Sequence, residues 1–451
     1  MPGTPHSDRD RREMLAALGI DAADALFADI PQSLRATAMP ELPPPLTEME
    51  LRDEARRVSD LNRNLDDLVC FAGGGIYDRF IPAIVGSVAS RPEFVTPYTP
   101  YQPEASQGTL EAIFEYQTMI SELTALPVAN ASLYDGATAM GEAVLMAADA
   151  TGRSRALMAG ALAPAARQAT RTYAEASGVQ IAEVPWDDAS GQTDLGALAE
   201  MLGDDVACVA LQQPNYFGCL EEMAEASWLA HEAGALFIAM VEPISLGVLA
   251  PPGEYAADIA VGEGQPLGLP PGFGGPLLGM FACTEQHLRR MPGRVVGRSV
   301  DADGKVAYCL TLQTREQHIR RARATSNICT NEGLCALAAS VYLAAMGPQG
   351  LREAALLGAE RAHELQEAMA DSGLQPRFGG AFLNEFALRL PGDAEATVRA
   401  LCEDGWLVGP TLGRDYPELS DCVLVAATER RTREEIAGLA EALQRAARPE
   451  D

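Results

Sequence analysis

A proline-studded stretch at residues 98–108 carries a high density of polar side chains. Pro100 and Pro103 hold the backbone extended, so the side chains around them project from it. We take this stretch as a candidate binding or active-site surface, because loops held by a rigid scaffold often carry function. A loop whose tyrosines are half-buried packing groups is an equal alternative. The polar candidates are Tyr98, Thr99, Tyr101, Gln102, Glu104 and Ser106.

Residues 134–142 have the composition of a helix start that approaches an anion. Asp135, Gly136, Ala137 and Thr138 lead into a helix just before strands and helices begin to alternate. A helix N-terminus presents free N–H groups and the positive end of the helix dipole, and both attract phosphate. A capped helix start packed tightly on its neighbour has the same sequence, so both interpretations stay open.

Residues 315–323 contain four arginines and one histidine in an otherwise acidic chain. These basic side chains could hold an anionic substrate group through bidentate hydrogen bonds. They could also tie acidic domains or subunits together, and we favour this structural role for most of them, because surface arginines usually pair with nearby carboxylates. The cations are Arg315, His318, Arg320, Arg321 and Arg323, of which Arg315 and His318 are kept as site candidates.

The chain contains a single lysine, Lys305, among 34 basic residues. Any mechanism built on a lysine Schiff base therefore has one candidate. Asp303 and Gly304 directly before it are a turn signal, which predicts an exposed hairpin tip. A catalytic amine needs a desolvated pocket, and a solvated turn next to aspartates is the opposite environment. We expect no catalytic lysine in this chain.

Composition narrows the classes of protein that fit. The 451 residues carry a formal net charge of −29, which argues against nucleic-acid and anionic membrane partners. No apolar run reaches the roughly 18 to 20 residues that a membrane span needs. Nine scattered cysteines without a CxxC pair, and a polar start without a signal-peptide pattern, indicate reduced core thiols and a cytoplasmic location. The five histidines lack metal-ligand spacing, so no metal site is expected.

Hydrophobic periodicity predicts an arm and two domains. Residues 1–60 form a helical arm, with helices at 10–18 and 21–27, a proline linker at 42–46 and a capping box at Thr47 and Glu50. Residues 61–325 form a large α/β domain with a mostly parallel sheet, because strand-like runs alternate with helical patterns. Its expected strands are 155–161, 179–185, 206–211, 235–241, 259–261 and 277–283, with helices at 164–177 and 221–233. Residues 326–451 form a smaller α+β domain, with helices at 331–346, 350–372, 394–403 and 433–446 and strands at 374–378, 385–390 and 423–427.

Six sequence blocks resemble the P-protein family of the glycine cleavage system, glycine dehydrogenase (decarboxylating). They lie in order at residues 98–119, 129–139, 242–265, 272–276, 289–297 and 310–334. The chain resembles subunit 1, or alpha, of the two-subunit form, because the family's catalytic subunit carries pyridoxal phosphate on a lysine that has no counterpart here. The resemblance implies an α/β fold of the type I pyridoxal-phosphate enzyme class, with an N-terminal arm, a large mixed-sheet domain and a small C-terminal α+β domain.

The resemblance also implies a function. With a lysine-bearing subunit 2, as a heterodimer or a heterotetramer of two such pairs, the chain would complete an enzyme that decarboxylates glycine, releases CO2 and passes the aminomethyl group to the lipoyl arm of H-protein. Pyridoxal phosphate is then expected on the partner subunit and not on this chain, which makes residues 135–138 a vestigial cofactor site. Ala163-Pro164 stands where the family often has His-Pro, and Arg323 where it commonly has lysine. The 98–106 segment is expected to face the partner's cofactor.

Two other functions remain open at this point. The chain could be an autonomous pyridoxal-phosphate decarboxylase or aminotransferase that uses Lys305. It could also be a purely structural or regulatory protein whose pocket has lost its function. No residue of the chain is certain to be catalytic on sequence grounds.

Overall fold

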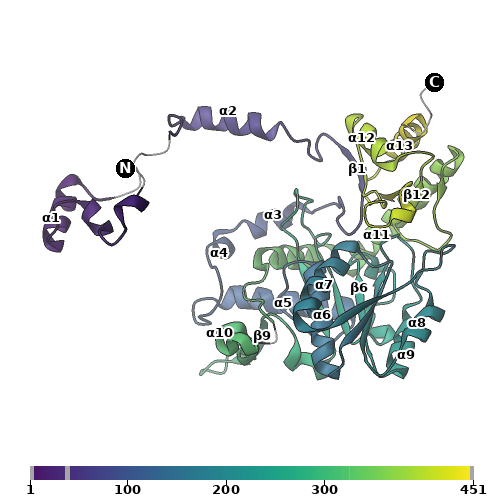
Figure 1. The fold of residues 1–451 in the computed structure, drawn as a ribbon, viewed down its shortest axis with the longest axis horizontal. Helices are drawn as coiled ribbons and strands as arrows, with labels where there is room; N and C mark the ends of the chain where they lie inside the picture. The colour runs from purple at the N-terminus through teal and green to yellow at the C-terminus, as the bar shows by residue number, and fades with distance from the viewer. Residues whose placement is uncertain (1–4, 36–40, 325, 447–451) are drawn as a thin grey trace. The chain divides into compact units, whose positions relative to one another are not determined.

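The computed structural model describes residues 5–35, 41–324 and 326–446, which fall into an N-terminal unit up to Arg63 and a compact body from Asn64 onward (Figure 1). The N-terminal unit contains α1 (Asp8–Leu18), η1 (Ala23–Phe27), η2 (Gln32–Leu34) and α2 (Glu48–Ser59). α2 begins with the predicted capping box of Thr47 and Glu50. The helix expected at 21–27 is a five-residue 3-10 turn, and its N-cap Ala22 offers no side-chain acceptor. None of the residues of α1 or α2 is buried.

A seven-stranded mixed sheet forms the centre of the body. Its strand order is β2-β8-β7-β6-β5-β3-β4, in which neighbours from β7 to β4 are parallel and β8 runs antiparallel to both of its neighbours. The predicted mostly parallel sheet is therefore confirmed. The central strands are continuous apolar runs, as expected of strands covered on both faces. The strands are β2 (Val128–Ala129), β3 (Arg155–Ala159), β4 (Gln180–Val184), β5 (Val206–Gln213), β6 (Leu236–Val241), β7 (Ile259–Glu263) and β8 (Gly279–Cys283).

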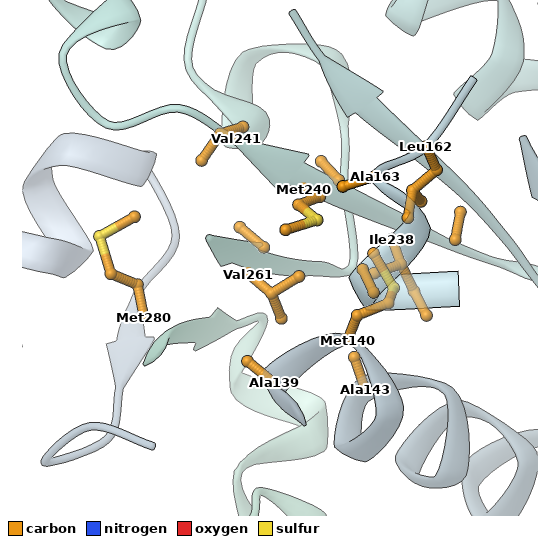
Figure 2. Close-up of a cluster of buried hydrophobic side chains, with 14 of the residues drawn as sticks. Ala139, Met140, Ala143, Leu162, Ala163, Ile238, Met240, Val241, Val261 and Met280 are labelled. Carbon is orange, nitrogen blue, oxygen red and sulfur yellow. The ribbon is translucent and has the colours of Figure 1, made fainter. Parts of the chain in front are cut away.

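Helices cover the sheet and bury its side chains. α6 and α7 pack on each other, α6 also packs on the central strands, and α9 packs on β5 and β6. Figure 2 shows Met140 of α6 directed toward Ile238 of β6, with Val261 of β7 beside them, and all three side chains are buried. The helices are α3 (Ala83–Ala89), α4 (Pro92–Val95), α5 (Gln107–Thr124), α6 (Gly136–Thr151), α7 (Pro164–Ser177), α8 (Leu195–Met201) and α9 (Met223–Glu232).

The C-terminal part of the body has a hydrophobic core of its own, in which Phe71, Phe386, Val425 and Leu439 meet. An antiparallel sheet of order β11-β12-β14 and three helices surround this core. Figure 1 shows β12, α12 and α13 together at one end of the body, whereas the first half of α11 packs on α3 and α5. The elements of this part are α11 (Gly333–Asp371), β11 (Gln375–Pro376), β12 (Glu385–Arg389), α12 (Ala394–Glu403), β13 (Trp406–Gly409), β14 (Cys422–Ala426) and α13 (Arg433–Ala446).

Strands at residues 69–72 and 406–409 are absent from the sequence prediction. β1 (Val69–Ala72) lies within the range predicted for the large domain, yet it pairs in parallel with β13 in the C-terminal part. Each strand has only four residues, and their pairing joins segments far apart in sequence, so no local periodicity reports it. The predicted domain boundaries, 1–60, 61–325 and 326–451, remain predictions.

A β-hairpin projects next to the start of α5. β9 (Val295–Val300) and β10 (Val306–Thr311) form an antiparallel pair, with Lys305 at its turn. The N–H of Lys305 donates to Asp301 Oδ1 at 2.8 Å and its side chain is exposed, as the turn signal predicts. Short segments connect the remaining elements: η3 (Ser245–Gly247), η4 (Pro252–Tyr255), η5 (Glu285–Arg290), η6 (Gln313–Arg315), α10 (Gln317–Arg320), η7 (Arg321–Arg323) and η8 (Pro417–Leu419).

α11 is, in the part of the chain that the structure describes, the one helix whose length and composition would suit a membrane crossing. Length and composition are weak evidence, because core helices meet the same criterion. Its backbone is non-helical at Gly347, directly before Pro348, as the predicted break between two helices requires. Residues such as Leu337, Tyr342 and Leu365 of this helix are buried in the body.

The nine cysteines are all free, and the structure corrects the expectation that they lie in the core. Six are buried, Cys309 and Cys402 are half-buried, and Cys329 is exposed.

Candidate functional site

The start of α6, predicted as a possible phosphate site, is occupied by carboxylates of the protein itself. Asp135 is the N-cap, and its Oδ1 accepts a hydrogen bond from the backbone N–H of Thr138 at 2.7 Å. The N–H of Gly136 donates to Glu263 Oε2 at 3.0 Å. Ala137, between them, is half-buried. Two carboxylates thus accept hydrogen bonds from two of the N–H groups at the helix start that could otherwise bind a phosphate.

Glu263 is fixed in this position by further contacts. Its Oε1 accepts hydrogen bonds from the backbone N–H groups of Gln265 and Leu278, each at 2.9 Å. Burial raises the pKa of Glu263 to about 7. A Cβ atom on Gly136 would lie 2.7 Å from the backbone nitrogen of Glu263, so the helix start is pressed directly against β7. Of the two interpretations of this segment, the structure supports the tightly packed helix start.

The carboxyl ends of the parallel strands are the usual ligand crevice of an open α/β sheet. Here they are closed by three carboxylates, the buried Glu385 and the half-buried Glu242 and Glu263, which we call the strand-end cluster. Glu385 accepts hydrogen bonds from the N–H of Gly74 at 2.8 Å and from the Tyr77 hydroxyl, and burial raises its pKa to about 7. The cavity left between them measures about 30 Å³. Such a cavity has room for one or two waters, whereas cofactor pockets measure roughly 300 to 1,000 Å³.

A buried ion pair also reaches the strand-end cluster. Nη2 of Arg79 lies 3.7 Å from Glu242 Oε1, and Nη1 of Arg79 lies 2.9 Å from Glu429 Oε2. Both glutamates have side chains at most one-tenth exposed, and Arg79 is more deeply buried still. Arg79 therefore joins the end of the central sheet to the C-terminal part of the body.

The remaining residues do not fit pyridoxal phosphate either. Ala163 precedes α7, and its methyl group provides no ring that could stack on a pyridine. Its N–H donates to Gln212 Oε1 at 2.8 Å. A wider cleft of about 720 Å³ opens beside Ala163 and Tyr216, but Lys305, the one lysine of the sequence, lies on the β9–β10 hairpin instead. Among the described residues, no lysine lies at this cleft or at the strand-end cluster, and the strand-end cluster offers neither the space nor the free helix start that would suit the cofactor.

Unlike the strand-end cluster, the 98–106 segment has exposed polar side chains. We call this segment, together with His318, the tyrosine face. Tyr98 is 85% exposed, and its hydroxyl forms a hydrogen bond with the Thr330 hydroxyl at 3.1 Å. Gln102 and Glu104 are exposed, while Thr99 and Ser106 are half-buried. The alternative of half-buried packing tyrosines is wrong for Tyr98.

The tyrosine face is held in place by α5 and the hairpin. Nε2 of Gln107, at the start of α5, donates to the carbonyls of Pro103 and Tyr308 at 2.7 and 2.8 Å. A cavity of about 360 Å³ lies beside the segment, lined by Tyr98, Arg294 and residues at the start of α11. The face therefore has both a fixed backbone and space for an incoming group.

Tyr101 contacts two side chains, those of Arg294 and His318, and Glu316 lies close to both of these. Arg294 Nη2 donates to the Tyr101 hydroxyl at 2.8 Å, and Arg294 Nε lies 3.5 Å from Glu316 Oε2. The His318 ring meets the Tyr101 ring edge-on, with centroids 6.1 Å apart. His318 Nδ1 also lies 3.5 Å from Glu316 Oε2. The structure thus brings together two predicted residues, Tyr101 and His318.

Arg315 has a structural role in this chain. It donates to the backbone carbonyls of Met291 and Gly293, the latter at 3.1 Å, and burial lowers its pKa. The side chains of Arg320, Arg321 and Arg323 are exposed. Salt bridges that would tie these three arginines to another part of this chain do not occur among the described residues.

Sequence reasoning missed three residues: Glu263 of the strand-end cluster, and Arg294 and Glu316, which lie beneath the tyrosine face. Glu263 and Gly136 are 127 residues apart, so only the fold reveals their contact. Arg294 and Glu316 lie inside blocks that resemble the P-protein family, and Glu316 directly follows Arg315. What marks these residues is that their charged side chains lie away from solvent, and burial cannot be seen in a single sequence.

Comparison with known proteins identifies the family. The family model described as "Glycine cleavage system P-protein" matches residues 3–443. The chain belongs to the glycine cleavage system P-protein family. It is 52% identical over 441 residues to the "Probable glycine dehydrogenase (decarboxylating) subunit 1" of Moorella thermoacetica, covering 98% of each chain. It is 48% identical to the protein of the same description from Geobacillus kaustophilus, covering 96% of each.

Solved structures agree with this assignment. The P-protein fold matches that of a glycine decarboxylase (P-protein) of the glycine cleavage system in inhibitor-bound form, with a TM-score of 0.92, 45% identity and coverage of 99% and 100% of the two chains. A sphingosine-1-phosphate lyase of Burkholderia pseudomallei, at 16% identity and a TM-score of 0.67, shares the fold alone and covers 92% and 94%. The predicted type I pyridoxal-phosphate enzyme fold is confirmed.

The chain is a subunit of glycine dehydrogenase (decarboxylating), as the sequence blocks indicate. The roles assigned to the residues of the tyrosine face, and to residues 135–138, stay predictions. Groups of three or more histidine, cysteine, aspartate or glutamate side chains suited to a metal ion do not occur within residues 5–35, 41–324 and 326–446.

Proposed function

We propose that this P-protein subunit 1 is the cofactor-free half of a two-subunit glycine decarboxylase. Its lysine-bearing partner, subunit 2, holds pyridoxal phosphate, which supplies the electron sink for loss of CO2 from glycine. The assembled enzyme releases CO2 and passes the aminomethyl group to the lipoyl arm of H-protein. The assembly is a heterodimer or a heterotetramer, located in the cytoplasm.

One observation carries this proposal: the strand-end cluster closes the place where the cofactor would bind in this chain. Glu263 occupies the N–H of Gly136, and the remaining cavity of about 30 Å³ is an order of magnitude too small for a cofactor. Lys305 lies at an exposed turn. A member of a pyridoxal-phosphate enzyme fold that cannot hold the cofactor needs a second chain to do the chemistry.

The tyrosine face is the surface that we assign to this partnership. It is exposed, it carries hydroxyl, amide and carboxylate groups, and its backbone is fixed by Gln107. Side chains held at set positions on a rigid support can orient a substrate in a neighbouring site. Tyr98, Thr99, Tyr101, Gln102, Glu104, Ser106 and His318 would complete the partner's active site in this way.

The test compares this chain alone with this chain assembled with subunit 2 of the same organism. Alone, it should show no visible absorbance of lysine-bound cofactor after incubation with pyridoxal phosphate, and no exchange of labelled bicarbonate into glycine. The assembled pair should catalyse the exchange, while subunit 2 alone should not. A coloured chain that bleaches on borohydride would support an autonomous enzyme using Lys305. A pair no more active than subunit 2 alone would support a purely structural protein.

A further inference from the structure

A buried guanidinium lies directly beneath the exposed tyrosine face. The side chain of Arg294 is 3% exposed and that of Glu316 is 4% exposed, whereas Tyr101 above them is 49% exposed. Burial of a charged pair is costly unless its geometry brings a compensating interaction. The role of the Arg294–Glu316 pair therefore depends on which side chains it contacts.

Arg294 constrains Tyr101 in two ways. Nη2 donates to the Tyr101 hydroxyl at 2.8 Å, and Cζ lies 5.1 Å from the centre of the Tyr101 ring. Nε of the same guanidinium lies 3.5 Å from Glu316 Oε2, so the charge of Glu316 attracts the guanidinium and holds it beside Tyr101 without a hydrogen bond to Nε. The His318 ring meets the tyrosine edge-on from another side. The position of the hydroxyl and the tilt of the ring are both set from within this chain.

The direction of the Arg294 hydrogen bond determines what the tyrosine can do next. A guanidinium has only donors, so the Tyr101 oxygen must accept, and its own proton is left to be donated elsewhere. Among the described residues, Arg294 is the one hydrogen-bond partner of this hydroxyl. A hydroxyl that accepts from a charged donor is polarised and becomes a stronger donor itself. The proton of Tyr101 is therefore available to an acceptor from outside the chain.

We propose that Arg294, held by Glu316, is a positioning residue that presents the Tyr101 hydroxyl as a hydrogen-bond donor to an anionic oxygen in the active site of the partner subunit. This inference rests on the proposed function. The carboxylate of glycine provides an oxygen of this chemistry. Arg294 itself stays buried and acts through Tyr101.

A double-mutant cycle in the assembled enzyme tests the coupling. Tyr101→Phe and Arg294→Lys should each lower kcat for glycine–bicarbonate exchange about 10-fold, the effect of losing one hydrogen bond to a charged group, with little change in KM. The double variant should be no slower than Tyr101→Phe, because Arg294 acts only through that hydroxyl. A double variant about 100-fold slower, the product of two independent effects, would overturn the proposal.

Matched controls separate positioning from general damage. Tyr308→Phe removes a hydroxyl from the neighbouring hairpin, where it contacts Glu111 at 3.3 Å, and Arg298→Lys changes an exposed arginine on β9. Both should exchange bicarbonate at the wild-type rate. Glu316→Gln, which keeps the shape but removes the charge that orients Arg294, should repeat the Arg294→Lys effect in part. This second variant keeps the test valid if Arg294→Lys does not fold, and wild-type exchange with Glu316→Gln would count against the proposal.

A measurement without turnover tests the geometry in this chain alone. The chain is labelled with 3-fluorotyrosine and its 19F NMR spectrum is recorded. The Tyr101 resonance is identified as the one that is missing from the spectrum of Tyr101→Phe. That resonance should shift in Arg294→Lys and Glu316→Gln but not in Arg298→Lys, and a resonance that moves in none of them would overturn the positioning role. If the wild-type pair has no exchange activity while the resonance shifts as expected, the proposed function fails and the positioning geometry stands. If the wild-type pair is active but the resonance does not move, only the positioning inference fails.

Discussion

The strand-end cluster and the tyrosine face differ in burial, in free space and in the state of their polar groups. In the cluster, one buried and two half-buried carboxylates surround a cavity of about 30 Å³, and the N–H of Gly136 already donates to Glu263. In the tyrosine face, Tyr98 and Tyr101 are exposed, a cavity of about 360 Å³ adjoins them, and the Tyr101 proton has no partner among the described residues. The usual ligand crevice of the fold is closed, whereas the tyrosine face, which lies outside that crevice, has exposed polar groups that can bind another molecule.

This difference predicts that the two regions respond to substitution in separate ways. Changes in the strand-end cluster should alter the free energy of unfolding and leave the chemistry of correctly folded enzyme intact. Changes in the tyrosine face should alter turnover and leave the free energy of unfolding intact. The comparison would fail if a substitution in the strand-end cluster lowered turnover of folded enzyme, or if one in the tyrosine face lowered the free energy of unfolding.

Gly136→Ala should have the largest effect. Its Cβ would lie 2.7 Å from the backbone nitrogen of Glu263 and 2.9 Å from the carbonyl carbon of Gly262, and backbone atoms cannot move away cheaply. We expect a loss of about 3 kcal/mol of unfolding free energy, measured by urea denaturation. Gly86→Ala is the control, because Gly86 lies in α3 with no atom near its Cβ position, and it should be neutral or slightly stabilising. Equal stability of Gly136→Ala and wild type would show that the helix start is not packed as described.

Tyr101→Phe combined with Gln102→Ala should have the next largest effect. Both side chains are exposed, so the melting temperature should change little. The exchange of labelled bicarbonate into glycine should fall roughly 10- to 100-fold in the assembled enzyme, because two groups that orient the substrate are lost. Wild-type exchange rates in an intact complex would remove the tyrosine face from the active site.

The pH dependence of stability should change in Glu385→Gln. Burial raises the pKa of Glu385 from 4.5 to about 7, so the folded state binds its proton more tightly than the unfolded state. The stability that this proton provides is complete below about pH 4.5 and is lost as pH rises through about 7. Relative to wild type, Glu385→Gln should therefore gain roughly 2 kcal/mol between pH 5 and pH 8.

Urea denaturation at the two pH values measures this gain. Glu367→Gln, which replaces an exposed glutamate on α11, is the control and should show no such trend. A stability difference between Glu385→Gln and wild type that is the same at both pH values would contradict the buried state of Glu385.

Lys305→Arg should have the smallest effect. Lys305 is exposed at the hairpin turn, and its backbone hydrogen bonds do not depend on the side chain. We expect less than about 0.5 kcal/mol of change in unfolding free energy and wild-type exchange in the assembled enzyme. Loss of exchange would revive the autonomous enzyme that uses this lysine.

Local sequence signals predicted much of the fold. The helices at 164–177, 394–403 and 433–446 have the predicted limits, because proline, aspartate caps and apolar periodicity mark their ends within a few residues. The β1–β13 pair was missed because both strands are short and far apart in sequence. A strand pair of this type cannot be predicted locally, because its two segments meet only when the chain folds.

The candidate site divides in the same way. The exposed polar residues of the 98–106 segment were visible in the sequence, because proline and tyrosine in a loop report exposure and rigidity locally. The partner of Gly136 and the buried pair of Arg294 and Glu316 were not, because each joins segments at least 20 residues apart. The vestigial role that the family resemblance implies for residues 135–138 stays a prediction, and the contact between Gly136 and Glu263 is a physical argument for it.

The central claim, that this chain completes an active site without holding the cofactor, can be tested by counting pyridoxal phosphate. The assembled enzyme, saturated with cofactor and freed of excess, is denatured in alkali, and the released cofactor is measured against the amount of each subunit. Our account predicts one pyridoxal phosphate for each pair of chains. Two for each pair, or any bound to this chain alone, would contradict it.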